Sequence, residues 1–282
     1  MLSYIVPFAL TLAACFGIQT LALRFVGGKT NKSESNFFSS VARIQAGIRD
    51  HPEVMLLGSS ITGRLPDRTG GFEGVANLGC DGGSAVDTLR ALDCGLLPSA
   101  SVLVIEGNTL YRSVGGHQSE IAKAIGSPWF QVGRQIPNLG ATARPSAFAY
   151  SQLLVRKFGS SLGMEGPILP INSRPVLAST ATSLGSDDQI LVKEMVEVCE
   201  HLKSRKVSLL LVILPSGDGS TLASRQIPMA LSHAAGVPVW DLTVGLPANA
   251  VKLTDGVHMD PASAAASLRT IMRELKSQKC GR

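Results

Sequence analysis

The amino-acid sequence predicts an α/β fold built on a parallel sheet. Short, continuous apolar runs are bounded by turn residues, as expected for strands that are covered on both faces. Segments with apolar residues at helical spacing separate most of these runs. Because alternating strands and helices favour right-handed crossovers between parallel strands, we expect a three-layer α/β/α arrangement. The 282 residues, of which 45% are hydrophobic, suffice for one large domain of this kind.

Five apolar segments are predicted to be strands of this sheet. They are residues 54–57, 74–79, 101–105, 207–214 and 237–242. The first segment is apolar throughout and ends at the turn Gly58-Ser59-Ser60. Pro238 lies at the start of the last segment and lacks an N–H for a sheet ladder, which indicates an edge strand. About five parallel strands with helices on both faces predict a flavodoxin-like domain.

Helices are predicted where apolar residues recur at intervals of three and four. The segments are residues 39–50, 84–97, 186–205, 224–235 and 260–275. Ser186 and Gln189 have the spacing of a capping box, which would begin the third of these helices. Pro228 is expected in the first turn of the fourth helix, where a missing N–H is tolerated. Asp260 followed by Pro261 predicts an N-cap and a first helical position.

The amino-terminal segment is long and apolar enough to cross a membrane. Residues 2–23 contain no Lys, Arg, Asp, Glu or His, and a helix of this length spans the hydrocarbon core of a bilayer. Residues 1–23 are therefore interpreted as a membrane anchor, and a cleaved secretory signal stays open. A lipoprotein signal with Cys15 as the lipidated residue is a third alternative, because Leu12-Ala13-Ala14-Cys15 resembles a lipobox. Residues 24–38 are predicted to be a linker, and residues 39–282 the domain.

The middle of the domain is predicted to be an insertion. Glycine and proline interrupt the pattern repeatedly over residues 111–185, with one or two short helices such as residues 147–158. A structureless stretch of this length is uncommon in a compact domain. We therefore expect an insertion that packs over the sheet as a cap facing the substrate.

Several function classes are not indicated by the composition. The net charge is +5, but the basic residues are scattered, which argues against a nucleic-acid-binding surface. The five cysteines form no Cys-x-x-Cys pair, and no His, Asp and Glu cluster has the spacing of a metal site. No Gly-x-Gly-x-x-Gly or phosphate loop follows the first strand. Neither a cofactor nor a metal is expected. His117 lies in the insertion, where it could contact a substrate.

A serine and a distant Asp-x-x-His pair could form a catalytic triad. A serine hydroxyl needs a base, a group that orients the base, and donors for the oxyanion. Asp255-Gly256-Val257-His258 follows the last strand, at the sheet edge where the serine turn also opens. An aspartate three residues before a histidine can bond the Nδ1–H and leave Nε2 facing a serine. The alternative is that Asp255 only caps a turn and His258 only precedes the last helix.

In their order along the chain, these motifs resemble those of the SGNH (GDSL-type) hydrolases. Gly58-Ser59-Ser60 stands where that family has Gly-Asp-Ser, which implies Ser60 as the nucleophile. Asn77-Leu78-Gly79 and Asn108 match the blocks that supply oxyanion donors. Asp255 and His258 match the Asp-x-x-His block. The resemblance covers about residues 50–110 and 186–277, and it implies an oxyanion hole formed by Ser60, Gly79 and Asn108.

The sequence departs from the family pattern in two places. Ser59 replaces the aspartate of the first block, which leaves the choice between Ser59 and Ser60 open. The third block, Gly-x-Asn-Asp in the family, becomes Glu106-Gly107-Asn108-Thr109. The shape of the oxyanion loop therefore differs from the family pattern. Glu106 could point into the site or face solvent, and solvent is the expected environment for an unpaired carboxylate.

The resemblance implies a serine-dependent ester hydrolase or O-acyltransferase that works through an acyl-enzyme. It implies small acyl groups, above all acetyl, on a cell-surface glycan as the substrate. Two expectations for the anchor conflict. Arg24, Lys29 and Lys32 follow the apolar segment and would keep the domain cytoplasmic by the positive-inside rule, whereas the resemblance implies a cytoplasmic-membrane protein with an extracytoplasmic domain. The rival function is a catalytically idle, membrane-tethered glycan-binding or scaffold protein.

Overall fold

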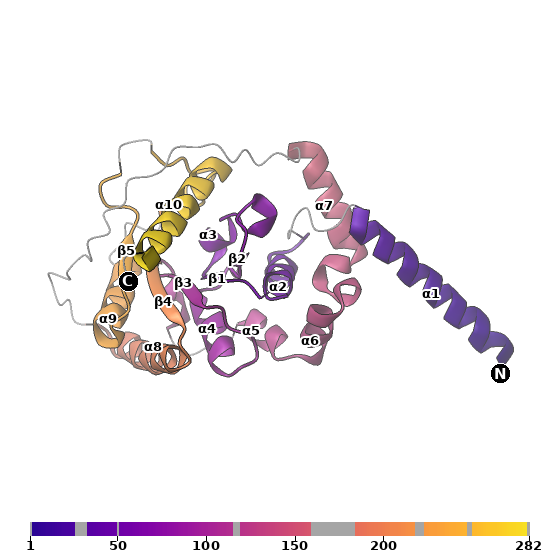
Figure 1. Ribbon diagram of the computed structural model, residues 1–282, viewed down its shortest axis with the longest axis horizontal. Coiled ribbons are helices and arrows are strands. Elements are labelled where there is room, and N and C mark those ends of the chain that lie inside the picture. Colours follow the sequence, from indigo (N-terminus) through magenta and orange to yellow (C-terminus); the bar gives the residue numbers. More distant parts are fainter. Residues whose placement is uncertain are drawn as a thin grey trace.

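The computed structural model of the chain contains one parallel sheet of five strands (Figure 1). It describes residues 2–25, 33–49, 51–114, 119–158, 184–217, 223–246 and 250–280. The strands are β1 (Val54–Leu57), β2 (Val75–Asn77), β3 (Val102–Glu106), β4 (Ser208–Ile213) and β5 (Val239–Asp241). They lie in the order β2-β1-β3-β4-β5 and every neighbouring pair is parallel. The predicted α/β class, the five strands and the edge position of the strand after Pro238 are confirmed.

Ten α-helices are present in the described part of the chain. They are α1 (Leu2–Phe25), α2 (Asn36–Gly47), α3 (Ser60–Gly63), α4 (Ala85–Asp93), α5 (Glu120–Ile125), α6 (Pro128–Gln135), α7 (Pro145–Phe158), α8 (Ser186–Ser204), α9 (Ala223–Ala235) and α10 (Pro261–Cys280). Short 3-10 turns η1 (Arg68–Gly70), η2 (Leu110–Ser113), η3 (Pro137–Leu139) and η4 (Ala141–Ala143) join them. The predicted helices are all found, with ends that differ by a few residues.

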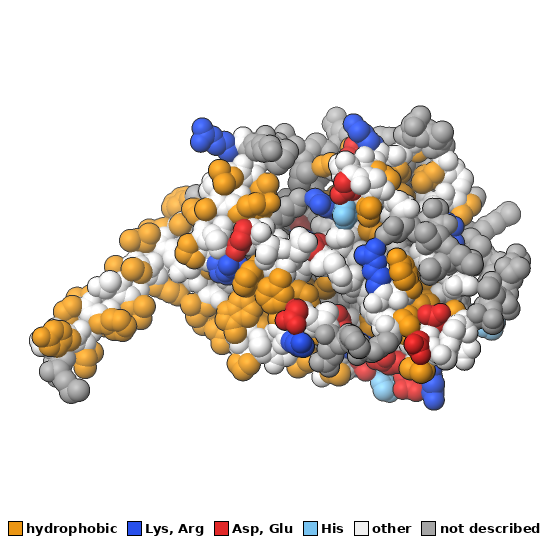
Figure 2. All heavy atoms as spheres, turned by 180° about the vertical axis from the view of Figure 1, so that it is seen from behind, with side chains coloured by type: hydrophobic (Ala, Val, Ile, Leu, Met, Phe, Trp, Pro, Cys, Tyr) orange, Lys and Arg blue, Asp and Glu red, His pale blue; other side chains and the backbone are white. Residues whose placement is uncertain are grey.

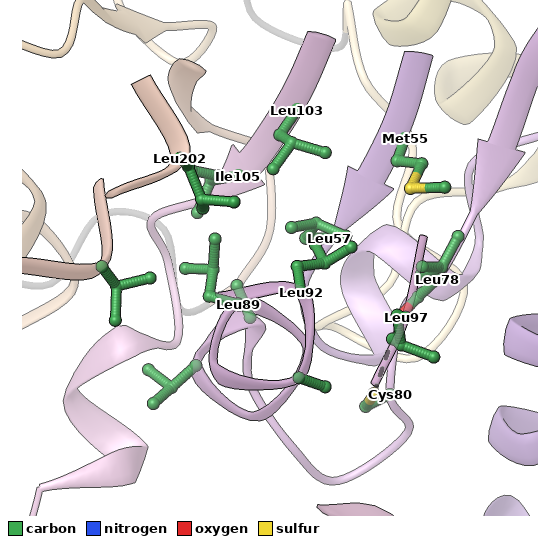
Figure 3. Packing of buried hydrophobic residues seen from close by; sticks show 14 of the residues in the cluster. Met55, Leu57, Leu78, Cys80, Leu89, Leu92, Leu97, Leu103, Ile105 and Leu202 are labelled. Atoms are coloured by element: carbon green, nitrogen blue, oxygen red, sulfur yellow. Dashed lines mark hydrogen bonds between the residues drawn. The ribbon is translucent and has the colours of Figure 1, made fainter. Parts of the chain in front are cut away.

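Helices cover both faces of the sheet because the strands are apolar on both sides. Along β1, Met55 and Leu57 belong to one buried cluster, whereas Val54 and Leu56 belong to another. The first cluster is completed by residues of α2, α4, α8 and α9, and the second by residues of α3 and α10. Figure 3 shows Leu89 and Leu92 of α4 beneath the side chains of the first face. This is the layered arrangement that the continuous apolar strands predicted.

The predicted start of the last helix is confirmed, whereas the predicted starts of two other helices differ from the structure. Asp260 caps α10 through its Oδ1, which accepts the Ser263 N–H over 2.8 Å, and Pro261 is the first helical residue, as predicted. The capping box at Ser186 is wrong, because Ser186 is already helical and Gly185 is the N-cap. The position expected for Pro228 is also wrong. It lies inside α9, past the first turn.

The amino-terminal helix is apolar and projects from one flank of the domain (Figure 1). Residues 3–25 have a mean hydropathy of 1.8, and none of the most apolar window is buried, so α1 meets the length and composition of a membrane-spanning helix. It extends to Phe25, and α2 begins at Asn36, so both ends of the predicted linker are helical. Residues 26–32 lie outside the described residues.

Most of the described part of the predicted insertion is residues 119–158, which form helices α5, α6 and α7 and turns η3 and η4. Its helices α5 and α6 and the turn η4 contact α2. Phe130 of α6 is fully buried in the cluster on that side of the sheet. This part of the insertion therefore extends the helical layer around α2. The remainder of the predicted cap, residues 159–183, lies outside the described residues, as does His117.

The strand order reverses between β1 and β3, which have neighbours on opposite sides. In open α/β sheets the loops diverge at this point and leave a crevice beyond the carboxyl ends of the strands. Gly58, Ser59 and Ser60 follow β1, and Glu106 is the last residue of β3. The two segments that the sequence analysis singled out therefore meet at the topological switch point.

Candidate active site

Ser60 is presented by a tight turn between β1 and α3. Ser59 is the N-cap of α3, and its Oγ accepts the Ile61 N–H over 3.1 Å. Ser60 is thus the first residue of the helix and is partly exposed, whereas Ser59 is completely buried. The local capping preference of serine explains why the two neighbouring hydroxyls have different environments.

His258 and Asp255 are held together by a closed turn. Asp255 Oδ1 accepts the backbone N–H groups of Val257 and His258 over 3.1 and 2.8 Å. Its Oδ2 lies 2.7 Å from His258 Nδ1. Gly256 has φ +79°, a conformation that glycine adopts without strain and that folds the aspartate back over the turn. The Thr254 N–H donates to the His258 carbonyl over 2.8 Å and closes the loop.

The imidazole joins this turn to the serine turn across 198 residues of sequence. His258 Nε2 lies 2.8 Å from Ser60 Oγ. Since the Asp255 carboxylate can only accept at Nδ1, the proton of a neutral imidazole is assigned to Nδ1, and Nε2 accepts from the Ser60 hydroxyl. The three side chains have the geometry of a nucleophile, a base and an orienting carboxylate. Ser59 is excluded from this role by its burial and its different partners.

The Asp255 carboxylate is strongly biased towards its ionised form. Hydrogen bonds from the backbone N–H and the side chain of His258, and from the Val257 N–H, hold the pKa of Asp255 well below its ordinary value. Half of the Asp255 side chain is exposed, but that of His258 is only 17% exposed. The carboxylate therefore remains charged next to the imidazole, where it would stabilise an imidazolium.

Glu106 is buried beneath the serine turn, and the expectation that it faces solvent is wrong. It is 1% exposed. Its Oε2 accepts the N–H groups of Ser59 and Thr62 over 2.9 and 3.0 Å, and the Thr62 hydroxyl over 2.6 Å. Its Oε1 accepts the hydroxyls of Ser59 and Thr109, each over 2.8 Å. The donors satisfy the carboxylate, which makes burial of its charge tolerable and fixes the backbone on both sides of Ser60.

Gly58 is required by this close approach. A Cβ at position 58 would lie 2.5 Å from Glu106 Oε2 and 2.6 Å from Glu106 Cβ, much closer than side chains approach one another. Ser59 and Thr109 stand at two positions where the family pattern has aspartate, and both donate to Glu106. The Glu106 carboxylate at the end of β3 thus accepts hydrogen bonds from the hydroxyls at both of these positions.

The predicted oxyanion donor Gly79 lies against the serine turn, but its N–H is already bonded. The Cys80 N–H donates to Gly58 O over 2.7 Å, which brings this loop beside β1. The Gly79 N–H donates to Asn77 Oδ1 over 2.9 Å. Asn77 Nδ2 in turn donates to the carbonyls of Thr62 and Leu65, each over 2.7 Å. Asn77 is therefore a brace between β2 and the segment that follows Ser60.

Asn108, which was predicted to be an oxyanion donor, has its side-chain amide bonded within the protein. Asn108 is completely buried. Its Nδ2 donates to Leu214 O over 2.8 Å and to Ser216 Oγ over 3.0 Å, and its Oδ1 accepts the Leu214 N–H over 2.8 Å. Asn108 therefore holds the loop after β4 to the end of β3. Of the three predicted donors, the Ser60 N–H alone has no acceptor among the described residues.

The other candidate chemistry is sparse. His201 lies 3.4 Å from Asp93 on the exposed surface. No group of three or more His, Cys, Asp or Glu side chains that could hold a metal ion occurs within the described ranges.

The roles of Glu106 and of its donor Thr62 were not predicted from the sequence. A charged residue that ends a buried strand was the one signal that could have indicated them.

No family model, curated protein or solved structure matches the chain.

Proposed function

We propose that the chain is a serine-dependent carboxylic ester hydrolase or O-acyltransferase of the SGNH type. The observation that supports it most is the 2.8 Å separation of Ser60 Oγ and His258 Nε2, in line with the 2.7 Å contact of His258 Nδ1 and Asp255. Such an arrangement activates a hydroxyl for attack on an acyl carbon. The strand order β2-β1-β3-β4-β5 supports a flavodoxin-like arrangement of the domain.

In the proposed first step, Ser60 Oγ forms a bond to the ester carbonyl carbon while its proton moves to His258 Nε2. Asp255 stabilises the imidazolium, and the Ser60 N–H donates to the oxyanion. The tetrahedral intermediate collapses by breaking the bond to the alcohol oxygen, which takes the proton from His258. The acyl group remains on Ser60.

In the second step, His258 takes a proton from an acceptor hydroxyl whose oxygen attacks the acyl carbon. The bond between that carbon and Ser60 Oγ then breaks, and Ser60 Oγ takes the proton back from His258. Water as acceptor gives a carboxylic acid, and a sugar hydroxyl gives a new ester. Both reactions use the same residues, so the triad serves either. Further oxyanion stabilisation requires Gly79 to exchange its bond to Asn77 for one to the substrate.

The proposed substrate is a small acyl ester, acetyl above all, of a cell-surface glycan. This part of the proposal follows from the resemblance of the motifs and from the apolar helix α1, which would tether the domain to the cytoplasmic membrane. We propose that the domain is extracytoplasmic, although the basic residues Arg24, Lys29 and Lys32 would favour a cytoplasmic domain by the positive-inside rule. Alkylation of Cys94, which is exposed, by a membrane-impermeant maleimide in intact cells tests the orientation.

Turnover of p-nitrophenyl acetate by the purified full chain in detergent tests the catalytic proposal. Wild type is expected to release p-nitrophenolate and to carry one acetyl group on the peptide containing Ser60. Ser60→Ala should abolish both. Ser99→Ala, which alters an exposed serine on the loop before β3, should leave both unchanged.

The idle glycan-binding alternative is favoured by one observation, the internal hydrogen bonds of Gly79 and Asn108. It predicts equal, background-level turnover by wild type and Ser60→Ala. The same comparison with an oligosaccharide acceptor separates this outcome from a transferase that rejects water. If wild type and Ser60→Ala show the same background turnover in both assays and bind the oligosaccharide saturably, the chain is a glycan-binding protein and not an enzyme.

A further inference from the structure

A stripe of exposed apolar side chains runs along α6 and η3. Trp129, Val132, Ile136 and Leu139 are 40–46% exposed. Trp129 and Val132 are three residues apart on α6, which places them on one side of that helix, while Phe130 is fully buried. Ile136 ends the helix in an extended conformation, and Leu139 follows in η3. We call these four residues the apolar stripe. Single exposed apolar residues are common on proteins, but a contiguous row of this kind indicates a contact surface.

The apolar stripe lies beside the point where the amino-terminal helix meets the domain. Gln19 Nε2 of α1 donates to the carbonyls of Asn138 and Ala143, each over 2.9 Å. Asn138 also hydrogen-bonds to Thr20. Asn138 is the neighbour of Leu139 in η3. Figure 1 shows α1 projecting away from the flank of the domain that carries α6 and α7.

The length of α1 before this contact places the apolar stripe at the edge of a bilayer. Residues 3–18 precede Gln19 and would span about 24 Å as a helix. The hydrocarbon core of a bilayer is about 30 Å thick. The segment is about 6 Å shorter than the core. If it crosses the core from the far side, the contact at Gln19 and the apolar stripe beside it are held just inside the headgroups, at the level of the upper acyl chains.

The composition of the same flank suits a lipid surface. The rings of Phe38 and Trp129 lie 6.4 Å apart, and those of Phe37 and Phe38 lie 5.0 Å apart, in edge-to-face contact. The Arg144 guanidinium stacks 3.4 Å from the Phe38 ring centroid. Residues 121–158 contain no Asp or Glu but include Lys123, Arg134, Arg144 and Arg156, of which Lys123 pairs with Glu120 and Arg144 with Glu34. Figure 2 shows apolar side chains gathered where α1 joins the domain.

We propose that the apolar stripe lies on the surface of the membrane that α1 crosses, in contact with the headgroups and upper acyl chains of anionic phospholipid. Aromatic rings and basic side chains are the groups that proteins place at this depth. The anchor and the apolar stripe together would hold the domain in one orientation against the bilayer. The inference depends on the anchor in the proposed function and is independent of the triad.

The chain supplies its own probe, because it has two tryptophans and Trp240 is buried. A Trp240→Phe variant of the full chain, reconstituted into vesicles of phosphatidylglycerol and phosphatidylcholine, reports on Trp129 alone. Lipids brominated on the upper acyl chain are expected to reduce its fluorescence by roughly half, more than lipids brominated near the chain end. Iodide on both sides of the vesicle should quench it weakly. If Trp240→Phe does not fold, the difference between wild type and Trp129→Phe gives the same information.

The matched control carries a tryptophan on the opposite side of the domain. Ile190 of α8 is 67% exposed, so Ile190→Trp with both natural tryptophans changed to Phe should be quenched by iodide and not by brominated lipid. The proposal is overturned if Trp129 behaves like this control. It is also overturned if brominated lipid fails to quench while cross-linking captures dimers through α6, since a second copy then covers the apolar stripe. If alkaline carbonate extracts the chain from the vesicles, α1 is not a membrane-spanning anchor and the inference fails. The esterase assay tests the triad separately, and its result does not depend on this outcome.

Discussion

Glu106 Oε2 and Thr62 Oγ1 lie 2.6 Å apart, and this hydrogen bond ties the end of β3 to the helical turn that begins with Ser60. Thr62 is 2% exposed and Glu106 is 1% exposed. The backbone N–H groups of Ser59 and Thr62 flank Ser60, and both donate to the same carboxylate oxygen. The position of Ser60 is therefore determined by a charged group whose hydrogen bonds do not include the imidazole.

Glu106→Gln is predicted to weaken both the fold and the reaction. The amide keeps the shape of the side chain but removes the charge, and hydrogen bonds to charged groups contribute about 1.5–3 kcal/mol to stability. We expect a loss of this size in urea unfolding and a fall in kcat of roughly 10–100-fold with little change in KM, because Ser60 shifts while the substrate contacts remain. Glu120→Gln is the control, since the side chain of Glu120 is 78% exposed.

A different outcome would limit Glu106 to a structural role. If Glu106→Gln loses stability but keeps the wild-type kcat at a temperature where it is folded, the carboxylate does not position Ser60. Glu106→Asp gives a second comparison, because it keeps the charge while shortening the side chain. It should recover more stability than activity.

Asn108→Ala is predicted to affect stability much more than catalysis. The substitution removes three hydrogen bonds and leaves the buried Leu214 N–H and carbonyl without this partner. We expect a loss of about 2–4 kcal/mol in unfolding free energy. At a temperature where the variant is folded, kcat/KM should stay within about threefold of wild type, whereas removal of an oxyanion donor lowers kcat roughly 100–1,000-fold. The larger effect would show that Asn108 turns towards the substrate during the reaction.

The sequence predicted the sheet and the turn of Asp255 and His258 because both depend on local patterns. A four-residue apolar run such as Val54–Leu57 is buried on both faces only as a central strand of a layered fold. Asp255 and His258 are close enough in sequence to form a turn by themselves. The roles of Glu106 and Asn108 depend on partners that are distant in sequence, Thr62 and Leu214. Whether a polar side chain at a strand end faces water or the interior is determined by those partners, which no local pattern contains.

Asp255→Asn is predicted to disturb the histidine without disrupting the fold. Asparagine can still accept the backbone N–H groups of Val257 and His258, but its amide can present an N–H to Nδ1 and favour the wrong tautomer. We expect kcat to fall about 10³–10⁴-fold with little change in melting temperature. Because triad residues act as a unit, the double variant with His258→Ala should be no slower than His258→Ala alone within about threefold. Additive losses would show that Asp255 acts independently of His258.

Two cysteine thiols are predicted to be unreactive in the native protein. Burial raises the pKa of Cys80 to about 12 and that of Cys199 to about 11. The reactive thiolate is therefore scarce at both positions at pH 8, whereas Cys94 is exposed. Iodoacetamide followed by mass spectrometry should label Cys94 quickly, and Cys80 and Cys199 only in denaturant. Equal labelling of Cys80 in the native chain would contradict the packing of the loop that carries Gly79.

Gly79→Ala is predicted to be strongly destabilising because two backbone segments meet at this residue. A Cβ at position 79 would lie 2.4 Å from Gly63 N and 2.7 Å from Ser59 O, and neither backbone atom can rotate away as the end of a side chain can. The loop would have to separate from the serine turn, which would strain the contact of Ser60 with His258. We expect a loss of about 2–4 kcal/mol together with reduced turnover. Gly126→Ala is the matched control, since its Cβ would meet nothing closer than 3.7 Å and its φ is −71°. It should be neutral or slightly stabilising, and an equal effect of the two substitutions would contradict the close approach at Gly79.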